Sequence, residues 1–584
     1  MKDNIKNILK ASWPVAAFEK LSGVVRRFSF AEKLVFYVLA AILIVSGLVM
    51  LQAVNRSVST DVPAAGGTFV EGIVGTPRFI NPVLAVSDAD QDLTELIYSG
   101  LMKATPSGAL VPDLAESYTV ATSGLVYTFT LRNDAYFSDG VKITADDVVY
   151  TINEIQDPAV KSPERPSFYD VTVTKIDDRT VAFTLKQPYA AFLDNLTVGI
   201  LPKHVWGNMS ADEFPLSEYN VEPIGSGPYE IGAMHTTNKN MIVMPTEYDL
   251  VPNDRYALGA PYIKDFVVKF YPDEASLLAG YQSGSVHAAA SIDPADAATA
   301  AKAGTVLTSP LPRVFAVFFN QNQSSVLAFK EVRQALSDSV DRSAIVSDVL
   351  SGYGSPISGP IPAGFLPAES SSSAVSYNLS EASSTLAKAG WSRNASGIWE
   401  KKAGKNMIDL SFTIATLASP DLVKAANIIA DEWRALGADV TVNEYDLGDL
   451  QQNVIRPRKF DALLYGLVTG RDMDFYAFWD SSQRNDPGLN ISMYASSAVD
   501  KLLEDARGTL DSARQMKDYA AFAADVEADV PAVFLYSPEF IYAVPNNVKG
   551  IDLGAITLPF ERYLGVNTWY IDTNNVWNAF LQKK

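Results

Sequence analysis

One run of apolar positions stands out from the rest of the pattern. Leu34 to Val54 contains 21 residues and no charged side chain. At about 1.5 Å rise per residue a helix of this length spans about 31 Å, close to the hydrocarbon thickness of a bilayer. It is apolar on every face, unlike the surface helix of a soluble domain. The pattern therefore predicts one membrane-spanning helix, and no second uncharged run of comparable length follows it.

Strict alternation of apolar and polar residues predicts strands in the part that follows. A first strand is predicted at 68–74, after a glycine pair, and half-buried strands at 127–131, 171–174 and 181–185. Between them Thr144 precedes an acidic residue at the third position and an apolar stripe at helical spacing, which predicts a capped helix ending near 155.

In the second half, helices and strands alternate. Helical spacing predicts helices at 274–282, 329–350, 381–389, 421–436, 498–507 and 512–529. Short apolar strands are predicted at 408–414, 439–444 and 462–465. This strand–helix rhythm, together with the irregular first half, indicates a mixed α/β (α+β) protein. No internal repeat is visible.

The charge distribution orients the predicted membrane helix. Residues 1–33 hold seven basic and three acidic side chains, a net charge of +4, directly before the apolar run. Positive flanks stay inside, so the N-terminus is expected in the cytoplasm and the large domain outside the plasma membrane. The apolar run is longer than that of a secretory signal. The nearest sequence that a signal peptidase would accept, Val62-Pro63-Ala64, lies ten residues beyond the end of the run. We expect an uncleaved anchor at 34–54 and a polar linker at 55–65.

Composition narrows the possible functions. A chain of 584 residues requires several globular units, and its net charge of −20 disfavours nucleic acid as a partner. There is no cysteine, so disulfides, thiolate metal sites and cysteine nucleophiles are excluded. His204, His235 and His287 lie too far apart for a local metal-binding motif, so neither a metal nor a cofactor is expected.

Several segments, in order along the chain, carry a family resemblance. They are Thr76–Pro82, Ser99–Met102, Gly108–Tyr118, Tyr127–Arg132, Phe137–Gly140, Thr144–Val148, Pro223–Tyr229, Phe318–Asn320, Val332–Leu336, Leu386–Trp391, Asp472–Tyr476 and Trp479–Gln483. Over about 66–575 the chain resembles the extracytoplasmic solute-binding proteins of the oligopeptide, dipeptide and nickel type that serve ABC transporters.

The resemblance implies a two-lobed periplasmic-binding-protein-like fold of type II, in which one lobe carries an extra subdomain. Two crossings of the chain join the lobes, which close on a ligand by a hinge motion. We place lobe 1 at 66–110, 223–308 and 536–575, its subdomain at 111–222, and lobe 2 at 309–535.

The resemblance also implies the function. The outer part is expected to capture a solute, with a peptide as the first choice, and to deliver it as a monomer to the permease subunits of an ABC transporter. An oligosaccharide remains an alternative solute, because the residue opposite the amine-binding acid of peptide-binding relatives is near Gly470 and is not acidic. The scarcity of histidine disfavours nickel.

Five residues near this position form the predicted ligand site. Charged groups that fix a ligand, followed by aromatic side chains, are typical of a cleft wall. The predicted ligand-binding residues are Arg471, Asp472, Asp474, Tyr476 and Trp479. Five further tryptophans, Trp391, Trp399, Trp433, Trp569 and Trp577, are expected in the core.

Two alternatives belong to other functional classes. A carboxylate-dependent hydrolase would require Asp472 and Asp474 to cooperate, although positions i and i+2 of a strand face opposite sides. No Gly-x-Ser-x-Gly motif is present. A surface receptor that retains the fold without transport is the second alternative. We therefore expect a protein without catalytic residues.

Overall fold

The structure is a computed structural model that describes residues 23–25, 28–239, 242–362, 364–365, 377–471 and 473–580. The chain divides into two units. Met1–Ala64 and Asp572–Lys584 form the first unit, and Ala65–Ile571 form the second. Of the predicted ligand-site residues, Asp472 lies outside the described residues.

The first unit contains the predicted membrane helix. Helix α3 (Phe30–Val58) begins after Ser29, which forms a capping box with Glu32, and none of its described side chains is buried. It is the one helix in the described part of the chain that is long and apolar enough to cross a membrane.

The segment predicted as a linker is ordered. Its first residues continue α3, and β1 (Ser59–Ala64) then pairs antiparallel with β23 (Asp572–Trp577). Residues 59–64 of the predicted polar linker at 55–65 therefore form a strand, whose partner comes from the far end of the chain. The same pairing places residues 572–575, predicted to belong to lobe 1, in the first unit.

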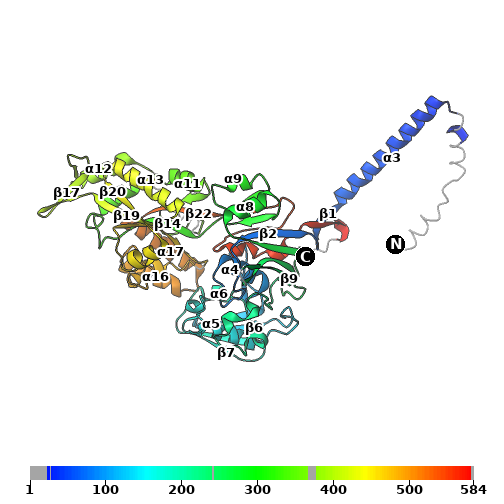
Figure 1. The fold of residues 1–584 in the computed structure, drawn as a ribbon, viewed down its shortest axis with the longest axis horizontal. Coiled ribbons are helices and arrows are strands. Elements are labelled where there is room, and N and C mark those ends of the chain that lie inside the picture. The colour runs from blue at the N-terminus through cyan, green and yellow to red at the C-terminus, as the bar shows by residue number, and fades with distance from the viewer. Residues whose placement is uncertain are drawn as a thin grey trace. The chain divides into compact units, whose positions relative to one another are not determined.

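A mixed sheet runs through the second unit (Figure 1). Its strand order is β20 (Asp439–Tyr445), β19 (Ser411–Leu417), β21 (Ala462–Val468), β14 (Arg313–Phe319), β22 (Ala532–Val544), β12 (Ala288–Ala290), β2 (Thr68–Val74), β11 (Asp265–Tyr271), β10 (Ile242–Pro252) and β9 (Tyr229–Lys239). Strands β13 (Thr305–Pro310) and β15 (Gly354–Pro356) pair with β22 outside this order.

Strand β22 belongs to both predicted lobes. Its first residues pair with β14, and its last residues pair with β12 and β13. The other crossing is the short connection between β13 and β14. We use the names lobe 1, subdomain and lobe 2 for the ranges given above, whose bounds stay a prediction.

Lobe 2 is built on a sheet that is covered on both faces. Alternate residues of β14 enter two different apolar clusters, Val317 and Phe319 in one and Ala316 and Phe318 in the other. This division follows from the two-residue period of a strand. Figure 1 shows α11 (Arg342–Leu350) and α13 (Pro420–Leu436) on one side, with α16 (Ser497–Gly508) and α17 (Ser512–Asp529) on the other.

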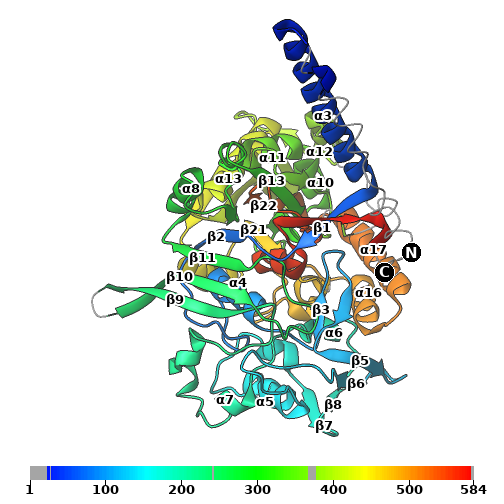
Figure 2. The same ribbon diagram turned by 90° about the vertical axis from the view of Figure 1, so that its right-hand side faces the viewer.

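The subdomain contains a four-stranded sheet and one long helix. The strand order is β5 (Ala115–Val120), β6 (Val126–Leu131), β8 (Thr180–Leu185) and β7 (Val171–Lys175), and these strands lie together in Figure 2. Every second residue of β6 is buried, as its alternation predicts. Helix α5 (Ala145–Gln156) begins with the predicted capping box between Thr144 and Asp147.

Two predicted elements differ from the structure. The helix predicted at 329–350 is two helices, α10 (Lys330–Asp338) and α11, because Asp341 caps the start of the second one. The strand predicted at 408–414 is divided at Leu410 between β18 (Asn406–Asp409) and β19, which belong to different sheets. In both places apolar residues continue across the break, so the periodicity of apolar positions does not reveal where one element ends and the next begins.

Candidate functional site

A cavity of about 410 Å³ lies between the lobes. Its lining comes from lobe 1 (α4, Asp88–Ile97, and the segment 557–561), from the subdomain (residues between 164 and 199) and from lobe 2 (Gly470 and Arg471). A smaller cavity of about 60 Å³ shares part of this lining and adds Lys103 and Asp113. We call the two together the cleft cavity.

Helix α4 supplies one wall of the cleft cavity. Ser87 caps the helix, and its buried side, which includes Leu93 and Leu96, packs on the lobe 1 core. Gln91, Thr94, Glu95 and Tyr98 follow at spacings of three and four residues and therefore share one face, which lines the cavity.

A glycine loop holds the end of this helix. The backbone N–H of Gly227 donates to the carbonyl oxygen of Ile97 at 2.8 Å. A Cβ atom on Gly225 would lie 2.0 Å from the same oxygen, so only glycine allows this approach. The segment Gly225–Pro228 thus fixes the position of Glu95 and Tyr98.

An ion pair connects the lobes inside the cleft cavity. Arg471, in the segment after β21, places Nη2 2.7 Å from Oε1 of Glu561, which belongs to lobe 1. The two side chains are only 16% and 9% exposed. The other carboxylate oxygen of Glu561 accepts a hydrogen bond from the backbone N–H of Thr557. Nη1 of Arg471 has no partner among the described residues, so it can donate to a carbonyl or carboxylate oxygen of a ligand.

The cleft cavity carries an excess of acidic groups. Glu95, Glu164, Asp194 and Glu561 line its larger part, where Arg471 is the one basic residue among the described lining residues, and the smaller part adds Lys103 and Asp113. Burial raises the pKa of Glu95 to about 7, although the nearby Lys103 ammonium opposes the shift. A cationic group of a ligand would favour the ionised form of Glu95. The cavity is therefore suited to a ligand that combines a cation with carbonyl groups.

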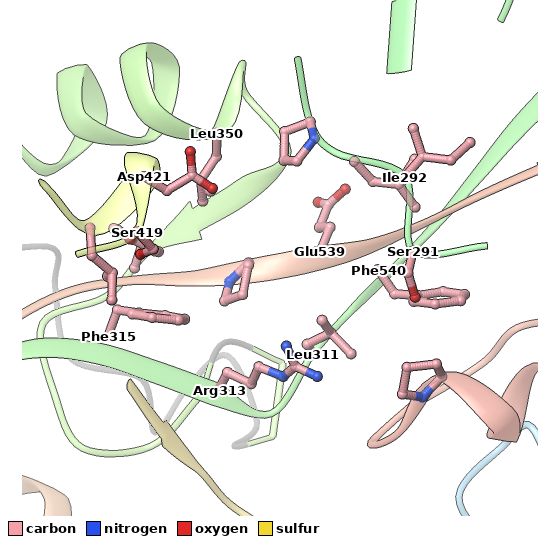
Figure 3. Close-up of a pocket in the computed structure, with 16 residues that line it drawn as sticks. Ser291, Ile292, Leu311, Arg313, Phe315, Leu350, Ser419, Asp421, Glu539 and Phe540 are labelled. Carbon is pink, nitrogen blue, oxygen red and sulfur yellow. The ribbon is translucent and has the colours of Figure 1, made fainter. Parts of the chain in front are cut away.

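A second cavity, of about 310 Å³, lies beside the two crossings of the chain (Figure 3). Leu311 and Arg313 belong to the crossing between β13 and β14, and Glu539 and Phe540 belong to the crossing strand β22. Asp421 faces them from lobe 2. We call it the hinge cavity. The segment 557–561 separates it from the cleft cavity, because Pro559 lines one and the adjoining residues line the other.

The hinge cavity is lined by charged groups of both signs. Nε of Arg313 has no partner among the described residues, and burial lowers the pKa of this guanidinium. Burial also raises the pKa of Asp421, and the nearby Asp293 carboxylate adds to the shift. These groups stand against an apolar wall that includes Phe315, which stacks on Tyr536 at a centroid distance of 5.0 Å.

The predicted site residues fall into three environments. Arg471 lines the cleft cavity, and Asp472 lies outside the described residues. Oδ2 of Asp474 pairs with Nε of Arg507 at 3.1 Å. The Arg507 guanidinium also lies 4.8 Å from the ring centroid of Tyr476.

The contact around Arg507 joins lobe 2 to the subdomain. Its guanidinium lies 5.2 Å from the ring centroid of Tyr189, and its carbonyl oxygen accepts from the backbone N–H of Ala190 at 3.1 Å. Asp474 and Tyr476 therefore support a contact between lobe 2 and the subdomain.

Trp479 has a different environment from the other predicted residues. It is 1% exposed and packs against Phe318, Phe522 and Phe534 in the core of lobe 2. No face of its indole is open to either cavity.

Glu95 and Glu561 were not predicted from the sequence. Glu95 lies on an ordinary amphipathic helix, and Glu561 lies in a short 3-10 helix (Pro559–Tyr563) without a recognisable motif. The nearest indication in the sequence was Ser99–Met102, one of the segments that carry the family resemblance, because it directly follows Tyr98. Nothing in the local pattern indicates that Arg471 pairs with Glu561.

One group of side chains has the geometry of a possible metal site. The ligand atoms of His235, Glu247 and Asp249 lie within 4.8 Å of one another on the β9–β10 hairpin. His235 Nε2 already contacts Asp249 Oδ2 at 2.9 Å, and Lys269 lies 3.6 Å from Glu247. These ion pairs account for the cluster without a metal.

Comparison with known proteins places the chain in a family. Residues 109–487 match the description "Bacterial extracellular solute-binding proteins, family 5 Middle". The chain is 30% identical over 508 residues to the oligopeptide-binding protein AppA of Bacillus subtilis, with 84% of this chain and 90% of that protein covered. It is also 27% identical to a probable D,D-dipeptide-binding periplasmic protein, DdpA, of Escherichia coli, over 85% of this chain and 93% of DdpA.

Solved structures agree with this placement. AppA of Bacillus subtilis in complex with a nonapeptide superposes with a TM-score of 0.64 and 28% identity, over 88% of this chain and all of that one. NikZ of Campylobacter jejuni in complex with Ni(L-His) gives a TM-score of 0.66 and 27% identity, over 86% and 99%. The predicted periplasmic-binding-protein-like fold and the predicted family are both confirmed. This chain belongs to the bacterial extracellular solute-binding proteins of family 5.

Proposed function

We propose that this protein captures peptides outside the cell membrane, holds them between its lobes, and delivers them to an ABC permease. The observation that carries the proposal is the cleft cavity, with its excess of carboxyl groups and the unpartnered donor of Arg471. The volumes of about 410 and 310 Å³ fall in the range typical of ligand sites. The named ligands of AppA and DdpA support a peptide.

The chemistry of the cleft cavity suits both parts of a peptide. Its acidic wall, in particular Glu95, provides a partner for an amine or a basic side chain. Arg471 provides a donor for a main-chain carbonyl oxygen. That either Asp472 or Asp474 binds the ligand amine stays a prediction, and the pairing of Asp474 with Arg507 favours Glu95 for this role.

The remaining parts of the proposal concern membrane attachment and turnover. Helix α3 holds the protein in the plasma membrane through 34–54, with the N-terminus in the cytoplasm. The protein acts as a monomer and releases the solute chemically unchanged, as expected of a carrier.

Calorimetric titration of the full chain in detergent tests the proposal. A short peptide with a free amine should bind, and its N-acetylated form should bind about 10- to 100-fold more weakly, because the carboxyl groups of the cavity lose their cationic partner. Glu95→Gln should remove most of this difference, while Asp474→Asn, the matched control, should preserve it. Asp472→Asn reports on the residue that the structure does not describe.

Two results would contradict the proposal. Binding of an oligosaccharide together with the absence of peptide binding would favour the alternative solute. Hydrolysis of the peptide during the titration, detected by mass spectrometry, would favour an enzyme.

A further inference from the structure

Two exposed aromatic residues lie at the end of β23. Trp577 is 53% exposed and Phe580 is 73% exposed. Their rings stack on each other with a centroid distance of 6.3 Å and an interplanar angle of 20°. Trp577 was expected in the core, and the structure contradicts that expectation. We call these two residues the aromatic pair.

The aromatic pair is fixed beside the end of the apolar helix. Nε1 of Trp577 donates to Oδ1 of Asn55 at 2.7 Å, and Asn55 directly follows the uncharged run 34–54. In the β1–β23 ladder Trp577 is opposite Ser59, the first residue after α3. Figure 2 shows β1 and its partner strand side by side where α3 ends. The aromatic pair therefore lies at the level where the apolar run ends.

Side-chain hydrogen bonds reinforce this position. Oγ1 of Thr60 donates to Oδ1 of Asn578 at 2.7 Å, and Nδ2 of Asn575 donates to Oδ1 of Asp61 at 3.0 Å. Polar contacts thus fix the two strands against each other, while the aromatic rings remain exposed.

We infer that the aromatic pair inserts into the interfacial layer of the outer leaflet, as a second membrane contact beside the anchor. This inference rests on the proposed membrane anchor. Because 34–54 spans about the hydrocarbon thickness, Asn55 and the side chains bonded to it fall at the boundary between hydrocarbon and headgroups. Tryptophan is enriched there, since its ring is apolar and its N–H requires a partner. Asn55 supplies that partner, so the ring can enter the layer without an unpaired donor.

The absence of cysteine makes a labelling experiment direct. A single cysteine is introduced at Ala579, between the aromatic residues, or at Thr573, which lies in β23 about 13 Å from Trp577 at 3.3 Å per residue. The full chain is labelled with an environment-sensitive fluorophore and reconstituted into phosphatidylcholine vesicles that contain nitroxide lipids. We expect the label at 579 to be quenched on the order of twofold more than the label at 573. The difference should disappear when Trp577 and Phe580 are both replaced by serine.

A third label, at Ile42 in the middle of α3, separates this inference from the proposed anchor. If the label at Ile42 is quenched, the anchor is in the membrane and the inference is tested separately. It is then overturned by equal quenching at 579 and 573, or by quenching at 579 that persists in the serine double variant. An unquenched label at Ile42 overturns the anchor and the inference together.

Discussion

The ion pair between Arg471 and Glu561 offers a sharp test of the site. It connects residues of different lobes at 2.7 Å and is mostly buried. Because it forms only when the lobes approach each other, its loss should weaken the closed, ligand-holding state more than the fold of either lobe. Arg471→Met retains much of the length of the side chain, removes its charge, and leaves Glu561 without its cation.

The expected magnitude follows from the burial of the pair. Breaking a fully buried ion pair costs about 3–5 kcal/mol. Glu561 keeps the hydrogen bond from Thr557, and the pair is not completely buried, so we expect a loss of about 2–3 kcal/mol. In affinity this corresponds to about 30- to 150-fold weaker peptide binding. Adding Glu561→Gln to Arg471→Met should recover part of the loss, because no unpaired carboxylate then remains.

Calorimetric titration of a peptide against the single and double variants measures these effects. Arg456→Met is the matched control, because its ion pair with Asp486, at 3.8 Å, is exposed and lies within lobe 2. That control should change the affinity by less than about twofold. Unchanged affinity in Arg471→Met, or a double variant weaker than Arg471→Met alone, would refute this account of the cleft.

Three further predictions concern other parts of the second unit. Because the pKa of Glu95 is raised to about 7, binding of a cationic peptide should weaken as the pH falls below 7, by up to about tenfold per unit, and Glu95→Gln should abolish this dependence in titrations across that range. Trp479→Phe should lower the free energy of unfolding by about 1–3 kcal/mol in urea and leave the affinity unchanged, whereas weakened binding at equal stability would place Trp479 in the site. Arg562→Met should cost about 3–5 kcal/mol in the same assay, because the buried Glu71 and Asp92 carboxylates lose their shared cation, and a stable variant would contradict this.

The sequence predicted most of the elements that bury one face. Strand β6 and helices α5 and α13 follow from the periods of two and 3.6 residues, since local spacing alone decides which side chains enter the core. The capping residue Asp341 was overlooked because apolar positions continue on both sides of it. A cap between two short helices is indicated by a single capping side chain and not by the helical periodicity of apolar residues.

The site was harder to predict than the elements. Arg471 was identified because it lies in a charged segment that resembles a known motif. Glu95 and Glu561 come from distant parts of the chain and meet Arg471 only through the packing of the lobes, which no local pattern encodes. The pairing of β1 with β23 was missed for the same reason, because its two strands lie near opposite ends of the sequence. Trp479 carried an ambiguous signal, since an aromatic residue after a charged segment is equally typical of a core.

The most direct test of the central claim is to identify the molecules that the protein carries. The full chain is extracted from bacterial membranes in detergent and denatured, and the released compounds are analysed by mass spectrometry, with the Arg471→Met variant treated in parallel. The account predicts short peptides from the unmodified protein and a much smaller amount from the variant. Release of an oligosaccharide or another solute without peptide bonds, or equal amounts of peptide from both proteins, would contradict it.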